Sequence, residues 1–188
     1  MKDKNLIIGG GGLLFYANVL NKLYAIANGK IITWGLGHNT HNITSIILCD
    51  LLSKSHLNGI RDYGLNVNWV PCVSCMNEEF DADSDLIYDI VVYEHKHEKI
   101  LIYGLPKNDN FGNNIKDKLD FLRSGNTILT NTYHGMYWGV LLKRNVLVIN
   151  LFSSRFYGMK YPVILTNVNE WKNYLNKTQT YNRCFRRM

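Results

Sequence analysis

Short apolar segments alternate with segments of helical periodicity through the second half of the chain. The strand-type segments are runs of Ile, Val and Leu, whereas the helical ones repeat their apolar residues every three or four positions. This alternation predicts an α/β protein with a mostly parallel sheet. The expected strands are 86–95, 99–106, 126–131, 146–152 and 161–166, and the expected helices are 113–125, 135–145 and 169–177.

The first half of the chain repeats this plan over fewer residues. An acidic segment, 77–85, separates the two patterns and suggests a boundary. We therefore expect two Rossmann-like halves, 1–85 and 86–188, of which the first is short. The elements expected in the first half are a strand from residue 5 into the cluster Gly9–Gly12, a helix over 19–29, a strand over 30–38, a helix over 43–56, an extended stretch over 58–65 and a strand over 65–72.

Composition limits the partners and the compartment. Hydrophobic residues make up 46% of the chain and charged residues 19%, as in a globular protein with a core. The net charge of +6 favours anionic partners, but basic residues are scattered except at 183–188, so we expect no nucleic acid. The chain has no run of about 18 apolar residues, and its start does not resemble a signal peptide, so we expect a cytoplasmic protein.

Several familiar site patterns are incomplete in this chain. Cys72 and Cys75 have the spacing of half a zinc site, but a second pair is missing and only His95 and His97 lie nearby, so no metal is expected. The glycine cluster departs from GxGxxG because Leu14 stands at the sixth position. Neither GxxxxGK[ST] nor GxSxG occurs, which argues against a P-loop and a hydrolase elbow.

Polar or glycine-rich loops follow four of the expected strands. Ligands bind beyond the carboxyl ends of parallel strands, and helix N-termini there attract anions. Glycine allows close backbone approach, and we expect Gly135 to leave the start of the helix beside it accessible to an anion. The loop residues that we expect to bind substrate are Gly10, Gly11, His38, Asn39, Glu94, His95, Lys96, Thr132 and Gly135.

Four motifs occur in order along the chain: IIGGGGLL at 7–14, WGLGHN at 34–39, GIRDYGL at 59–65 and TNTYHGMYWGVLL at 130–142. In this order they resemble the polysaccharide pyruvyl transferase family. The resemblance implies a two-domain enzyme of the glycosyltransferase-B type. Such an enzyme moves a pyruvyl group from phosphoenolpyruvate, its co-substrate, onto a sugar of a cell-surface polysaccharide or its precursor and forms a ketal.

The resemblance also implies site residues and partners. It places the donor site around Arg61 of the RD motif and His134 of the HG motif. The acceptor is expected to be a saccharide, either carried on a lipid or not, so contact with the inner face of the membrane would suit the enzyme. Members of the family usually have a further stretch before the first motif. We therefore expect that the first half is minimal, that the chain is a fragment, or that a partner chain completes it, and an oligomer would also suit the enzyme.

The chemistry of phosphoenolpyruvate explains the same residues independently. Its phosphate and carboxylate need cationic or N–H-rich partners, which Arg61, Lys96 and the helix start beside His134 can supply. Ketal formation begins with protonation of the methylene carbon, and histidine is the natural acid near neutral pH. His134 either delivers this proton or holds the departing phosphate. The base that accepts the proton of the sugar hydroxyl would be His38, His95 or Glu94. We also expect that one cleft is lined by Arg61, His95 and His134.

Other interpretations remain open. His134 could cap a helix, Arg61 and Asp62 could form an ordinary ion pair, and Lys96 could be a solvated charge. Many members of the family have arginine where this chain has Thr132, so one anion-binding group is missing. The rival functions are a glycosyltransferase that uses a nucleotide sugar, with Glu170 holding the ribose, and a non-catalytic remnant.

Overall fold

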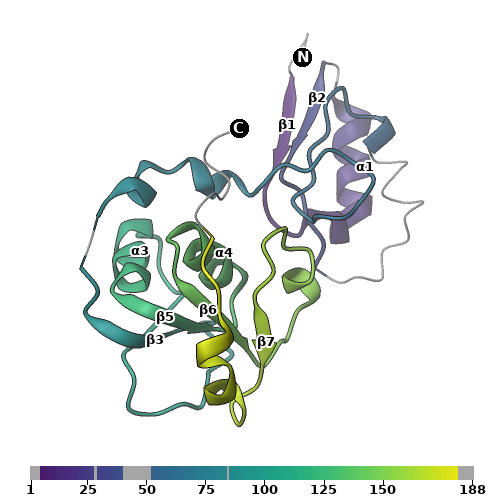
Figure 1. Cartoon of the computed structure of the whole chain (residues 1–188). Coiled ribbons are helices and arrows are strands. Elements are labelled where there is room, and N and C mark those ends of the chain that lie inside the picture. The colour runs from purple at the N-terminus through teal and green to yellow at the C-terminus, as the bar shows by residue number, and fades with distance from the viewer. Residues whose placement is uncertain (1–4, 28, 40–51, 84, 182–188) are drawn as a thin grey trace. The chain divides into compact units, whose positions relative to one another are not determined.

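The computed structural model describes residues 5–27, 29–39, 52–83 and 85–181. The chain divides into two compact units (Figure 1). The first comprises Met1–Ser74 and Ser153–Lys160, and the second comprises Cys75–Phe152 and Tyr161–Met188. The helix expected over 43–56 lies outside the described residues except for its last turn.

The first unit is built on two parallel strands, β1 (Leu6–Gly9) and β2 (Ile31–Trp34). The connection between them consists of a short 3-10 helix, η1 (Leu13–Tyr16), and helix α1 (Ala17–Ile26), as the sequence predicts. Parallel strands need such a crossover, and α1 packs its apolar face against them. The buried core of this unit contains Ile8, Leu14, Leu20, Ile31, Leu36, Leu52 and Ile60.

The strand expected over 65–72 does not form. Only isolated bridges continue the sheet there, one between Leu36 and Ile60 and one between Ile60 and Trp69. Ile60 accepts a hydrogen bond from the Val70 N–H at 2.9 Å, but the next residue is Pro71, which has no N–H to donate. Pairing therefore ends after one bridge, although the apolar alternation favours a strand.

The second unit contains a five-stranded, fully parallel sheet in the order β4-β3-β5-β6-β7. Helix α3 (Ile115–Arg123) precedes β5, and helix α4 (Tyr133–Leu141) precedes β6. This half is therefore α/β and compatible with a Rossmann-like fold. No helix in the described ranges is long and apolar enough to cross a membrane. The strands are β3 (Tyr88–Glu94), β4 (Lys107–Asp109), β5 (Gly125–Thr130), β6 (Asn145–Ile149) and β7 (Ile164–Thr166).

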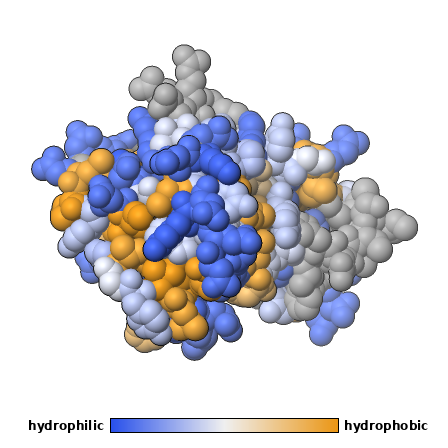
Figure 2. All heavy atoms as spheres, turned by 60° about the horizontal axis from the view of Figure 1, so that its bottom comes forward, coloured by the Kyte–Doolittle hydropathy of each residue, from blue (hydrophilic) through white to orange (hydrophobic). Residues whose placement is uncertain are grey.

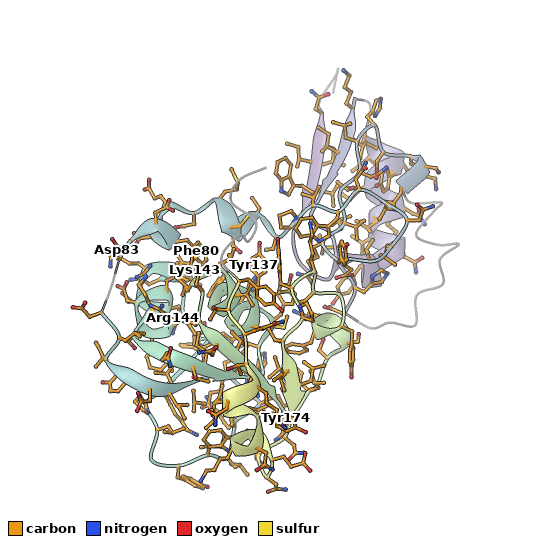
Figure 3. All side chains as sticks on the ribbon, in the orientation of Figure 1. Phe80, Asp83, Tyr137, Lys143, Arg144 and Tyr174 are labelled. Atoms are coloured by element: carbon orange, nitrogen blue, oxygen red, sulfur yellow. The ribbon has the colours of Figure 1, made fainter. Side chains whose placement is uncertain are left out.

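The sheet of the second unit is covered differently on its two faces. Helices α3 and α4 cover one face, and the short 3-10 helix η5 (Trp171–Lys177) lies on the other (Figure 1). Tyr137 of α4 and Tyr174 of η5 mark these opposite sides in Figure 3. The side that carries η5 has a core of Val92, Ile100, Ile102, Leu129, Leu147, Ile149 and Trp171.

One expected strand of this unit was wrong, and one expected helix forms as a 3-10 helix. The segment 99–106 is not a strand, because the Ile102 N–H bonds to the Ile100 carbonyl at 2.9 Å and turns the backbone away from extended pairing. Its alternation is nevertheless real, since Ile100 and Ile102 are buried while Leu101 and Tyr103 are exposed. Figure 2 brings the bottom of Figure 1 toward the viewer and shows apolar surface among hydrophilic residues there. The helix expected over 169–177 is the 3-10 helix η5.

The acidic segment packs on the second unit instead of ending the first. It forms the 3-10 helix η3 (Glu78–Asp81), whose Phe80 is buried. The Arg123 guanidinium donates a hydrogen bond to the Glu79 carbonyl, and Arg144 donates to the Arg123 carbonyl at 2.9 Å. Figure 3 shows Phe80 and Arg144 beside α3 and α4. The compact units therefore divide at residue 74, whereas the sequence suggests a boundary near residue 85.

We expect Leu129→Ala to lower the free energy of unfolding by about 2–5 kcal/mol, because Leu129 lies in the central strand with no exposed surface. Leu101→Ala is the matched control, since 67% of that side chain is exposed and the expected change is within about 0.5 kcal/mol. Urea denaturation of both variants measures the difference. Equal losses would contradict the assignment of Leu129 to the core.

Candidate functional site

The polar loops of the first unit meet at one edge because backbone hydrogen bonds join them. The Gly37 N–H donates to the Gly11 carbonyl at 3.1 Å, and the Arg61 N–H donates to the Leu36 carbonyl at 2.8 Å. The loops after β1, after β2 and around Arg61 therefore lie side by side, and they carry the candidate residues Gly10, Gly11, His38, Asn39 and Arg61. Gly10 and Gly11 have φ of 73° and 67°, the left-handed region that glycine adopts without strain.

His38, Arg61 and Asp62 form a buried cluster at this edge, which we call the histidine–aspartate cluster. The Asp62 Oδ2 accepts the backbone N–H of His38 at 2.6 Å and lies 2.7 Å from the His38 ring Nδ1. The Arg61 Nε lies 3.8 Å from the other carboxylate oxygen. Only 7%, 4% and 6% of the respective residues is exposed. From the sequence, Asp62 is expected only as an ion-pair partner of Arg61, and its adjacency to Arg61 is the one signal for it.

Close packing against glycine fixes the surroundings of the cluster. A Cβ atom on Gly37 would overlap the Arg61 side chain, and one on Gly12 would overlap the side chain of Asn39. The Asn39 Oδ1 is buried, and the described residues offer it no hydrogen-bond partner. Asn39 is therefore held against the glycine loop.

A segment distant in sequence completes this edge. Residues 153–160 belong to the first unit, although they follow β6 of the second. The Ser154 hydroxyl donates to the Asn39 carbonyl at 2.9 Å, and the Tyr63 N–H donates to the Gly158 carbonyl at 2.9 Å. This segment is not predictable from the sequence, because nothing in its residues indicates which unit they join.

In the second unit, the strand order reverses between β3 and β5. β4 lies on one side of β3, and all later strands lie on the other. In open parallel sheets, ligands bind at this reversal, beyond the carboxyl ends of the strands. The loops that begin with His95 and with Asn131 follow these two strands directly. We call them the switch-point loops, 95–98 and 131–132.

Asn131 joins the two switch-point loops. Its Oδ1 accepts the His95 N–H at 2.7 Å, and its Nδ2 donates to the Glu98 carbonyl at 2.7 Å. The residue is buried, so both polar groups of the amide are satisfied inside the protein. The sequence does not predict that Asn131 bonds to the other loop, although its position directly after the strand is a signal for a functional residue.

His134 lies in the first turn of α4, as the second residue of the helix. The helix begins two residues earlier in the chain than the sequence predicts. The helix starts at Tyr133 instead of near Gly135, because the Thr132 hydroxyl caps it by accepting the Gly135 N–H at 2.8 Å. The His134 imidazole is exposed and stacks on the Trp138 ring, with 4.8 Å between centroids and 25° between planes. The ring therefore has a fixed support one turn along the helix.

The expected role of Gly135 was wrong. Its N–H serves the Thr132 cap, and the residue is buried. A Cβ atom there would overlap the Thr130 hydroxyl and lie 2.7 Å from the Tyr93 ring. Packing therefore requires glycine at this position. The presence of glycine is not explained by the access of an anion to the Gly135 N–H.

Glu94 holds the loop after β3. Its Oε2 accepts the Ile100 N–H at 2.9 Å, and its carboxylate lies 3.2 Å from the Lys99 ammonium and 3.8 Å from that of Lys107. Asp109 binds Lys99 at 3.0 Å, and this hydrogen bond raises the pKa of Lys99. The interactions leave Glu94 a structural role and do not support its expected role as a base or substrate ligand.

The remaining predicted residues differ in their surroundings. The His95 ring packs on Phe152 with 5.1 Å between centroids, and its Nδ1 faces the backbone N–H groups of His97 and Glu98 at 3.3 and 3.4 Å. Lys96 is exposed, and its backbone N–H bonds to Asn110. Arg61 belongs to one unit and His134 to the other, so their common cleft stays a prediction.

Cys72 and Cys75 are buried thiols, and their turn contains the 3-10 helix Val73–Met76. Within the part of the chain that the structure describes, no group of three or more His, Cys, Asp or Glu side chains could hold a metal ion. No family model, curated protein or solved structure matches the chain. The functional argument therefore depends on the residues and their geometry.

We expect Asn131→Ala to loosen the switch-point loops, because both hydrogen bonds to 95–98 are lost and the buried backbone groups lose their partners. The free energy of unfolding should fall by about 1–3 kcal/mol. Amide hydrogen exchange should become faster at 95–98 in particular. Asn113→Ala, at an exposed asparagine, is the control and should change neither quantity. Unchanged exchange at 95–98 would show that Asn131 does not hold the loop.

Proposed function

We propose that the protein is a pyruvyl transferase-like enzyme that moves the pyruvyl group of phosphoenolpyruvate onto two hydroxyls of a saccharide. The observation that carries the proposal is the position of His134. It is an exposed histidine in the first turn of a helix, beside the point where the strand order reverses, and its ring is supported by Trp138. An acid that must protonate carbon needs such a fixed position.

The reaction assigned to this site balances as follows. A proton adds to the methylene carbon C3 of phosphoenolpyruvate, so C2 becomes electrophilic. One sugar hydroxyl adds to C2, the C2–O bond to phosphate breaks, and the second hydroxyl completes the ketal at C2. The two hydroxyl protons are accounted for by the new C3–H bond and by the hydrogen phosphate released. His134 supplies the first proton, and a base accepts the proton of the attacking hydroxyl.

Two groups of this chain suit the anionic donor. Arg61 brings a guanidinium to the edge of the first unit, beside the glycine loop, and Lys96 brings an exposed ammonium to the switch-point loops. Thr132 cannot replace the arginine of the family as a cation, because its hydroxyl is neutral, and this hydroxyl already caps α4. We propose that Arg61 and Lys96 carry the charge compensation for phosphate and carboxylate.

The acceptor is proposed to be a sugar of a capsule or other exopolysaccharide, or a precursor carried on a lipid at the inner face of the membrane. The second candidate is a glycosyltransferase of the same architecture that uses a nucleotide sugar. One observation favours it: Glu170 is exposed a few residues after β7, where a carboxylate could meet a ribose. The choice of donor separates the two candidates.

We expect phosphoenolpyruvate to raise the melting temperature of the wild-type protein, and nucleotides and nucleotide sugars to leave it unchanged. His134→Gln should keep this stabilisation by phosphoenolpyruvate, because Arg61 and Lys96 are the groups proposed to compensate the charge of the donor. Its rate of pyruvyl transfer should nevertheless fall by about a hundredfold or more, because glutamine cannot deliver the proton. Ketal formation and phosphate release, measured with 13C-labelled phosphoenolpyruvate, give the rate.

Each alternative outcome has a distinct meaning. Stabilisation by a nucleotide sugar alone would favour the glycosyltransferase, and stabilisation by no donor would favour a non-catalytic remnant. Wild-type transfer by His134→Gln would show that His134 is not the acid. His97→Gln is the matched control, because His97 is also exposed near the end of a neighbouring strand but has no assigned role.

A further inference from the structure

We propose that His38 and Asp62 form a general-base dyad, in which Asp62 orients the imidazole so that its Nε2 accepts the proton of the attacking sugar hydroxyl. The reaction rests on the proposed function, whereas the geometry of the dyad can be tested without it. Asp62 is a positioning residue in this account, because it acts through His38.

The hydrogen bonds of Asp62 determine which ring nitrogen is basic. A carboxylate can only accept hydrogen bonds, so the Nδ1 that lies 2.7 Å from the Asp62 Oδ2 must carry the hydrogen. In the neutral ring, Nε2 then keeps its lone pair. The backbone N–H of His38 donates to the same Oδ2 at 2.6 Å, so the carboxylate fixes both the main chain and the ring.

Asp62 is itself held in place from two directions. The Arg61 Nε lies 3.8 Å from its Oδ1 and offers a positive charge to the buried carboxylate. Gly158 also packs against it, since a Cβ atom there would come within 2.9 Å of the Asp62 Cβ and Oδ1. A carboxylate confined in this way can hold the imidazole in one orientation through a reaction.

The other two base candidates lack an equivalent basic atom. The His95 Nδ1 accepts from the backbone N–H groups of residues 97 and 98, so the proton of the neutral ring is on Nε2 and its lone pair is already used. The carboxylate of Glu94 is occupied by a backbone N–H and two lysines. His38 alone among the three presents a nitrogen that can take up a proton.

The glycine loop leaves room for a ligand at this edge. A Cβ atom built on Gly10 would meet no atom within 4 Å, so the loop is not filled by neighbouring side chains at that position. This open backbone belongs to the loops joined to Gly37, the residue before His38. In the proposal, the saccharide hydroxyl approaches the dyad from this side of the edge.

The test measures the tautomers directly by NMR of the full chain labelled with 15N-histidine, at a pH at which the imidazole rings are neutral. His38→Gln and His95→Gln assign the two sets of signals. We expect His38 to carry its hydrogen on Nδ1 and His95 to carry it on Nε2. Asp62→Ala should abolish the Nδ1–H signature of His38, whereas the control Asp117→Asn, at an exposed carboxylate, should leave it unchanged.

A kinetic cycle tests the role in the reaction. His38→Gln should lower kcat for pyruvyl transfer by about a hundredfold or more. Asp62→Asn should lower it too, but should cause no further loss in the His38→Gln background, because Asp62 acts through the ring. The wild-type spectrum decides the geometry even where a variant fails to fold.

The outcomes separate this inference from the proposed function. A His38 ring with its hydrogen on Nε2 overturns the dyad, and so do independent, multiplying losses in the cycle. A wild-type protein that transfers no pyruvyl group overturns the proposed reaction and the role of the base in it. In that case an Nδ1–H tautomer would still support the oriented His38–Asp62 pair.

Discussion

Parallel pairing is the constraint on which both functional clusters depend. Every strand of a parallel sheet ends at the same edge, so residues far apart in sequence meet there once the strands are in register. In the first unit this brings the loops of Gly11, Gly37 and Arg61 into hydrogen-bonding contact. In the second it places the loops of His95 and Asn131 on neighbouring strands, where one buried amide joins them.

Buried polar groups then convert this arrangement into fixed geometry. Asp62 binds both the main chain and the ring of His38, and Asn131 binds two backbone groups of another loop. Each buried group would be costly without its partners, so each loop has one favoured conformation. His134 is positioned by other means, since a capped helix start and an aromatic ring support an exposed imidazole.

The sequence predicted the features that depend on local pattern. The strands of the second sheet around 88–94, 125–130 and 145–149 follow from apolar runs, and the gathering of polar loops follows from the strand ends. Features that depend on distant contacts were missed. The sequence does not indicate that Ser154 and Gly158 join the first unit, or that an Ile102–Ile100 hydrogen bond breaks an alternating segment. The role assigned to Gly135 was wrong because it was argued from a helix start, whereas packing against Thr130 and Tyr93 decides it.

The central claim is that the supported imidazole of His134 is the acid that acts on phosphoenolpyruvate. A crystal structure of the protein with phosphoenolpyruvate bound tests it most directly. The account predicts a donor molecule whose methylene carbon faces the His134 imidazole. A donor bound away from His134 would contradict the account.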